Sequence, residues 1–243
     1  MYHRQANSYN YTKANRDKWD LHYIVVHYDA GKKATARNNV DAFTHLLTGT
    51  SAHYFVDEVE VAMSLDPKHI AHHCGGAKYN NGTPAPLHKI CKNSNSIGVE
   101  LCSDFVNGKY IITEATALRG AGFVAWLMRE YDIPIDRVVR HYDVTGKHCP
   151  MPYVDEAEWK KFKNLIIKTL KETSSNTQKE GEEMVYYEKL TDIPAGVIRD
   201  TVEKYVDMGI IKGNSQGLHL SEDMARMVVF FERRMQEHLN TQA

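Results

Sequence analysis

One short segment of the chain combines groups that can bind a metal ion and take part in hydrolysis. It runs Arg-His-Tyr-Asp-Val-Thr-Gly-Lys-His-Cys-Pro from Arg140 to Pro150, and so brings an imidazole, an ammonium group and a thiol into one loop. Another imidazole, His27, ends the apolar run Tyr23-Ile24-Val25-Val26, which has the composition of a buried strand. We therefore expect His27 to face this loop from a strand end, where two His and one Cys form an open zinc site.

The number of protein ligands separates hydrolytic zinc sites from structural ones. Structural sites are closed by four ligands, commonly as Cys-x-x-Cys pairs, whereas hydrolytic sites use three and leave the fourth position to water. The four cysteines of this chain, Cys74, Cys91, Cys102 and Cys149, lie far apart and form no such pair. Since an open site lets Zn²⁺ lower the pKa of water and polarise a carbonyl, the pattern indicates amide hydrolysis. The three other cysteines are expected to pack as small buried side chains.

Strands and helices alternate around these residues, which predicts an α/β domain. The segment from 71 to 92 is rich in Gly, Asn, Pro and His and is expected to be a long loop of the kind that carries function. Apolar residues at three- and four-residue spacing predict helices, and short apolar runs predict strands. The helices are expected at 38–48, 113–131 and 155–170, and the strands at 23–27, 53–56, 61–64 and 96–101.

The composition changes after Leu170. Residues 171–183 are polar and have no apolar anchor, which predicts a linker. Beyond it, 197–208 and 222–239 have the periodicity of amphipathic helices joined by a Gly-rich turn. We therefore expect a domain over residues 1–170, a linker over 171–183 and a small helical domain over 184–243. A module of this size is marginally stable alone, so a homodimer through its helices is one expectation.

Overall composition sets further bounds on partners and compartment. The 243 residues are 42% hydrophobic and 25% charged, as in ordinary soluble domains, and a formal net charge of −1 predicts neither a nucleic-acid nor a membrane partner. No run is as long as a membrane span, and the polar first 20 residues lack the apolar core of a signal peptide. We expect a protein made in a host cytoplasm, where cysteines stay reduced.

Four ordered blocks carry a resemblance that covers roughly residues 21–170. They resemble the zinc-dependent N-acetylmuramoyl-L-alanine amidases of the phage-lysozyme and peptidoglycan-recognition-protein type. The resemblance implies a central mixed β-sheet flanked by helices, and a hydrolase of bacterial peptidoglycan. Such an enzyme cleaves the amide between N-acetylmuramic acid and L-alanine with zinc-activated water, here as a phage or prophage endolysin that acts on the wall after release. The blocks are Tyr23–His27, Ser51–Asp57, Ser96–Glu100 and His141–Pro150.

The resemblance also implies roles for individual residues. The zinc ligands of the family fall on His27, His141 and Cys149. The family's Lys two residues before the Cys falls on Lys147, which would stabilise the oxyanion of the tetrahedral intermediate. A catalytic Glu of the Bacillus-type phage members falls on Glu100, which would take the proton of the attacking water and pass it to the leaving amine. The alternative for a Glu in an apolar strand is a buried partner of an Arg or Lys.

Other positions are left with two possible roles. The stretch His72-His73-Cys74-Gly75 resembles one that lines the substrate groove of relatives, so His73 is a predicted substrate contact. His53 either lines that groove or is a hydrogen-bonded strand histidine. Asp143 either orients His141 or caps its loop. Many phage-lysozyme-like relatives have a Tyr where this chain has Ala52, which places more weight on Glu100 as the base.

Two other functions fit parts of the pattern. A recognition-only protein of the same fold would bind peptidoglycan without cleaving it, although such relatives usually lose the ligand Cys. A cysteine peptidase would use Cys149 with His141 or His148 as its base. The tail also has a weaker resemblance to wall anchors of the surface-layer-homology type, through Thr191–Pro194 and Tyr205–Gly213, but it lacks their Thr-Arg-Ala-Glu signature. Wall binding and self-association are the two roles considered for it.

Overall fold

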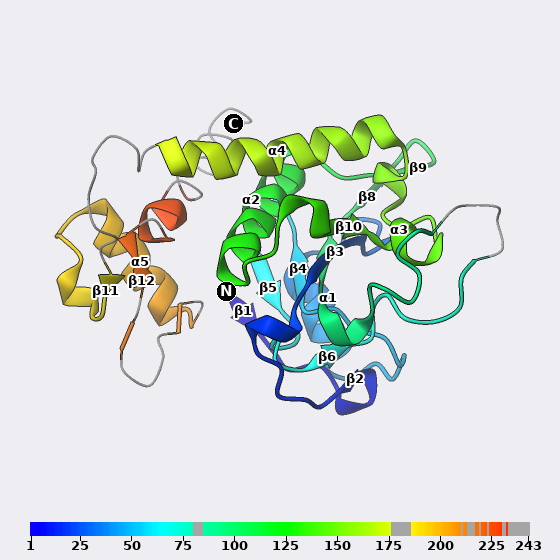
Figure 1. Ribbon diagram of the computed structural model, residues 1–243, viewed down its shortest axis with the longest axis horizontal. Helices are drawn as coiled ribbons and strands as arrows, with labels where there is room; N and C mark the ends of the chain where they lie inside the picture. The colour runs from blue at the N-terminus through cyan, green and yellow to red at the C-terminus, as the bar shows by residue number, and fades with distance from the viewer. Residues whose placement is uncertain are drawn as a thin grey trace. The chain divides into compact units, whose positions relative to one another are not determined.

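The central element of the protein is a mixed sheet flanked by helices (Figure 1). Its six strands have the order β1-β5-β4-β7-β3-β10. The computed structural model describes residues 1–79, 85–175, 186–209, 211–212, 217–218, 220–222, 224–229 and 232. The chain divides into two compact units, residues 2–166 and residues 167–243, and the sheet belongs to the first. The sheet and its flanking helices confirm the predicted α/β fold class.

Four neighbouring strands of the sheet, β4, β7, β3 and β10, run parallel to one another. Strand β5 is antiparallel to β4, and β1 is parallel to β5. The strands are β1 (Tyr2–His3), β3 (Tyr23–Tyr28), β4 (Tyr54–Val56), β5 (Val61–Met63), β7 (Ser96–Leu101) and β10 (Val138–Arg140). Two smaller antiparallel pairs are β2 (Tyr11–Thr12) with β6 (Ile70–Ala71) and β8 (Asp104–Val106) with β9 (Lys109–Ile111).

The two faces of β7 have different partners because side chains alternate along a strand. One face presents Ile97, Val99 and Leu101, all fully buried, and helix α2 (Glu114–Glu130) packs on this strand. The approach is close, since a Cβ added to Gly120 of α2 would lie 2.5 Å from Leu101 Cδ2. The opposite face therefore remains for other residues of the strand and the loops beside them.

Helix α1 (Ala36–Phe43) begins two residues before the predicted start at 38 and ends five residues before the predicted end at 48. Thr35 caps its first turn, and Asp57 Oδ2 accepts a hydrogen bond from Ala36 N at 2.7 Å. After the helix, the fully buried Asn10 side chain donates to Leu46 O at 2.6 Å and accepts from Gly49 N at 3.0 Å. Partners distant in sequence thus set both ends of this segment, which local periodicity does not reveal.

The other two predicted helices of the first unit are present. Helix α2 has Thr113 as its N-cap, and α4 spans Glu156–Ser175 and stacks Phe162 on Tyr153. Helix α4 continues past the expected end at Leu170, so residues 171–175 of the predicted linker are helical and residues 176–183 lie outside the described residues. The 3₁₀ turns are Ser8–Asn10, Lys18–Asp20, Asn93–Asn95, Ile135–Arg137, Met151–Tyr153 and Leu190–Asp192.

The second unit contains a small apolar core. Strand β11 (Tyr186–Tyr187) pairs with β12 (Leu220–Ser221), and α5 (Val197–Asp207) matches the helix predicted over 197–208. Of the predicted helix 222–239, residues 222, 224–229 and 232 are helical and the rest lie outside the described ranges. No helix in the part of the chain that the structure describes is long and apolar enough to cross a membrane. The core consists of Tyr187, Ile193, Val202, Leu220 and Ala225.

Candidate metal centre

Three residues that could ligate a metal ion meet at the carboxyl ends of parallel strands. His27 is the fifth residue of β3, and His141 opens the short helix α3 (His141–Thr145) directly after β10. Cys149 follows α3 and returns to β3, with its Sγ 3.5 Å from His27 Nδ1. One potential ligand atom from each of the three lies within 4.8 Å of the others, and all three residues are buried. The structure therefore brings the predicted metal ligands together.

The loop that carries His141 and Cys149 is held by hydrogen bonds at both ends. Asp143 accepts a hydrogen bond from Arg140 N at 2.8 Å and forms an ion pair with the buried Arg140 guanidinium at 2.7 Å. Gly146, with a φ of +79°, ends α3 in the left-handed conformation, and Tyr142 N donates to Cys149 O at 2.8 Å. Of the two roles open for Asp143, the structure supports the cap.

The protonation chemistry of the three side chains fits a bound cation. Burial lowers the pKa of His141 to about 3 and the pKa of His27 well below its ordinary value, which leaves both imidazoles neutral with a lone pair available. His141 Nδ1 is buried and has no hydrogen-bond partner among the described residues. Burial raises the pKa of the Cys149 thiol to about 12, so a thiolate here needs a cation beside it. Two imidazoles and one thiolate are a typical zinc donor set.

Glu100 and Lys147 act on the same cluster. Glu100 lies opposite His27 in the β3–β7 register, and its Oε2 is buried without a hydrogen-bond partner in the described structure. Burial raises the pKa of Glu100 well above its ordinary value, the charge of Asp29 adds to this, and the charge of Lys147 opposes it. The exposed Lys147 also lowers the pKa of His27, His141 and Cys149 through its charge. A carboxyl group thus lies beside His27 in the sheet, and the charge of an ammonium group acts on all three potential ligands.

His73 lies against one of these ligands. Its Nδ1 is 3.0 Å from His27 Nε2, and its Nε2 is 3.1 Å from Ser96 Oγ. The ring occupies the space over Gly98, where an added Cβ would lie 2.8 Å from His73 Cγ. The structure therefore brings His73, predicted as a substrate contact, to the metal cluster through His27.

His53 lies deeper in the protein and exposes no surface. Its Nδ1 accepts a hydrogen bond from Gly98 N at 2.9 Å, and its Nε2 is 3.2 Å from His69 O and 3.0 Å from Arg16 Nη2. Because both ring nitrogens have protein partners, this geometry favours the structural role over contact with a substrate.

Arg16 is a residue of this region that the sequence analysis did not identify. Its guanidinium donates to Pro67 O at 2.7 Å, to Asn93 O at 3.0 Å and to Ser96 O at 3.1 Å. Burial lowers its pKa to about 10. These bonds tie the start of β7 to the loops on either side, and a single Arg in a polar segment has no local pattern that predicts them.

The remaining cysteines are buried free thiols. Cys74 and Cys91 pack in an apolar cluster with Val25, and Cys102 packs in another with Phe55. Their surroundings agree with the packing role expected for them.

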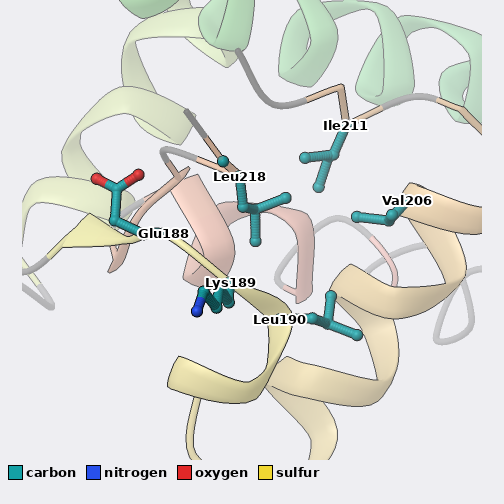
Figure 2. Close-up of a pocket in the computed structure, with 7 residues that line it drawn as sticks. Glu188, Lys189, Leu190, Val206, Ile211 and Leu218 are labelled. Carbon is teal, nitrogen blue, oxygen red and sulfur yellow. The ribbon is translucent and has the colours of Figure 1, made fainter. Parts of the chain in front are cut away.

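A separate pocket lies in the second unit, and Figure 2 shows its lining. It has a volume of about 330 Å³, apolar walls and two charged residues, and none of the predicted site residues lines it. Its lining residues are Glu188, Lys189, Leu190, Val206, Ile211, Gly217 and Leu218.

The chain is similar in sequence to known proteins of one family. Over 165 residues the chain is 34% identical to the N-acetylmuramoyl-L-alanine amidase CwlL of Bacillus licheniformis, a match that covers 63% of this chain and 44% of the relative. It is 37% identical over 149 residues to the N-acetylmuramoyl-L-alanine amidase XlyB of Bacillus subtilis, which covers 61% of this chain and 43% of the relative. The chain thus spans less than half the length of these relatives.

Solved structures agree in fold. The catalytic domain of XlyA superposes with a TM-score of 0.52 at 25% identity, covering 68% of this chain and 99% of that domain. PlyL superposes with a TM-score of 0.54 at 22% identity, covering 68% of this chain and 96% of PlyL. A family model described as N-acetylmuramoyl-L-alanine amidase matches residues 17–152, which include all three potential metal ligands. The chain belongs to the N-acetylmuramoyl-L-alanine amidase family.

Proposed function

We propose that this chain hydrolyses the amide between N-acetylmuramic acid and L-alanine in bacterial peptidoglycan. The observation that carries the proposal is the meeting of His27, His141 and Cys149 beside Glu100 and Lys147. Three potential ligands rather than four fit an open, hydrolytic metal site. Family membership supports the same reaction, and the names of the relatives supply its substrate class.

The three ligands would hold Zn²⁺, which when bound supplies a Lewis acid for the scissile carbonyl and lowers the pKa of water. Glu100 is the proton carrier: its carboxylate takes a proton from the attacking water and returns it to the nitrogen of the leaving alanine. Its Oε2 is buried and has no hydrogen-bond partner among the described residues, which leaves it available for this role. Lys147 Nζ stabilises the negative charge that develops on the carbonyl oxygen.

The same proposal includes a place of action and a role for residues 184–243. We propose that the chain acts on the cell wall in the manner of an endolysin, and that residues 184–243 serve wall binding or self-association. Sedimentation with purified walls and analytical ultracentrifugation distinguish these two roles. Loss of wall binding on truncation at residue 184 supports the first, and a dimer that becomes a monomer supports the second.

The decisive experiment is digestion of purified peptidoglycan by the full chain, with new alanine N-termini scored against new reducing sugars. Alanine amines that disappear with a chelator and return with zinc support the proposal. Activity that survives the chelator and releases other stem-peptide amines would indicate a cysteine peptidase instead. Binding without any new amine on several wall types would refute hydrolysis and indicate a recognition protein.

A further inference from the structure

A continuous chain of hydrogen bonds leads away from the metal cluster into the protein. His27 Nε2 is 3.0 Å from His73 Nδ1, His73 Nε2 is 3.1 Å from Ser96 Oγ, and Ser96 Oγ donates to Lys92 O at 2.5 Å. The Ser96 side chain is fully buried, so solvent does not compete for its hydroxyl.

The end of this chain sets the direction of every bond in it. A backbone carbonyl only accepts, so Ser96 must donate its proton to Lys92 O and accept from His73 Nε2. A neutral His73 that carries its proton on Nε2 must accept at Nδ1, and His27 must then donate from Nε2. This leaves the lone pair of His27 Nδ1 on the side of Cys149, whose Sγ is 3.5 Å away.

We propose that His73 is a positioning residue that holds His27 in the tautomer needed to bind a metal ion through Nδ1. This role rests on the proposed zinc site, and it differs from the groove-lining role that the family resemblance implies. Ligand histidines are oriented by the partner of their other nitrogen, and loss of that partner typically costs 10- to 100-fold in metal affinity.

The surroundings of His73 hold its ring for this role. Gly98 leaves the space that the ring occupies, and Asn93 Oδ1 accepts hydrogen bonds from the backbone N–H groups of His73 at 3.1 Å and Cys74 at 2.8 Å. A Cβ at Gly75 would in turn lie 2.8 Å from Asn93 Nδ2. Gly98 therefore supports the His73 ring, and Asn93 holds the His73 backbone, before any metal ion binds.

The test measures zinc affinity by competition with a chromophoric chelator in the full chain. His73→Phe keeps a ring over Gly98 and removes both ring nitrogens, and we expect zinc affinity to fall by about 10- to 100-fold. Ser96→Ala keeps His73 and removes the hydroxyl that orients it, and we expect a smaller fall in the same direction. The matched control is His72→Ala, because the His72 ring contacts Thr12 and Gly49 rather than a metal ligand, and its zinc affinity should equal that of the wild type.

A second readout does not depend on zinc. Nitrogen-15 NMR of the wild-type protein, after zinc has been removed with a chelator, should show His27 protonated on Nε2. In Ser96→Ala, part of the His27 population should shift to the form protonated on Nδ1. Protonation of His27 on Nδ1 in the wild type would overturn the proposal, as would unchanged zinc affinity in folded His73→Phe and Ser96→Ala variants. A wild-type chain that binds no zinc would instead refute the proposed metal site, while the tautomer measurement still tests the hydrogen-bond chain.

Discussion

Glu100→Gln should separate the catalytic role of this carboxyl group from its effect on stability. The side chain lies beside His27 on the strand pair β3–β7, and its Oε2 is buried without a partner among the described residues. Glutamine has nearly the same shape and resembles the protonated acid, but it cannot accept a proton from water. The substitution therefore removes the base with little change in packing.

We expect the turnover rate to fall by about 10²- to 10⁴-fold, the range for loss of a general base, which corresponds to about 3–5 kcal/mol of activation free energy. The substitution should raise the stability of the folded protein even though it lowers the rate. Burial raises the pKa of Glu100 well above its ordinary value of 4.5. Between pH 4.5 and the folded-state pKa, the folded state therefore keeps a proton that the unfolded state has lost. The free energy of unfolding of the wild type therefore falls as pH rises from 4.5 towards the folded pKa.

The glutamine variant lacks this loss. After zinc has been removed with a chelator, the variant and the wild type should have similar free energies of unfolding below pH 4.5. The variant should become the more stable of the two as the pH rises above 4.5. Urea titrations at a series of pH values measure this difference, and zinc-loaded protein gives the rates. Glu130→Gln, at the end of α2, is the control and should keep the wild-type rate. A rate loss below about tenfold, or a variant that is less stable at every pH, would refute the reasoning.

Three further substitutions test other parts of the site and its support. Lys147→Met should lower turnover by about 10²- to 10³-fold while zinc binding persists, because it removes the charge opposite the developing oxyanion, and retained turnover in a kinetic assay would contradict this role. Arg16→Met leaves the carbonyl oxygens of Pro67, Asn93 and Ser96 without this donor and should lower the free energy of unfolding by about 3 kcal/mol in urea denaturation. A change below about 1 kcal/mol would show that other groups hold the loops around β7 in place. Asp57→Ala removes the acceptor for Ala36 N and Glu60 N, and should lower the free energy of unfolding by about 1–2 kcal/mol and Tm by about 2–8 °C. An unchanged Tm in calorimetry would show that these hydrogen bonds do not stabilise the start of α1.

The parts of the fold that could be predicted are those with a strong local pattern. Strand β7 and helix α2 were expected within one residue of their observed bounds, because each combines a regular apolar period with a clear start and end. A site of two His and one Cys was also predictable, since the loop 140–150 holds His and Cys and His27 ends an apolar strand; the family resemblance then implied His141 as the loop histidine. Parallel strands then bring their carboxyl ends to one edge.

The hairpin β8–β9 was not predicted although its turn carries a signal. Asn107 and Gly108 have φ values of +49° and +80°, and an Asn-Gly pair between two short apolar runs is the usual sequence of a two-residue hairpin turn. The ends of α1, the hydrogen bonds of Arg16 and the contact of His73 with His27 had no such signal. Each depends on a partner at least 20 residues away, which appears only when the chain has folded.

The six residues of strand β7 contribute both to the apolar core and to the candidate site. Side chains two apart share a face, so Ile97, Val99 and Leu101 form the apolar face while Ser96, Gly98 and Glu100 form the other. On that second face Ser96 orients His73, Gly98 leaves room for its ring, and Glu100 stands opposite His27. A shift of one residue in the β3–β7 register would place apolar side chains under His73 and move Glu100 into the core. The apolar face therefore does more than stabilise the sheet, because by setting the register it also sets the positions of the proton carrier and the support of the metal ligand.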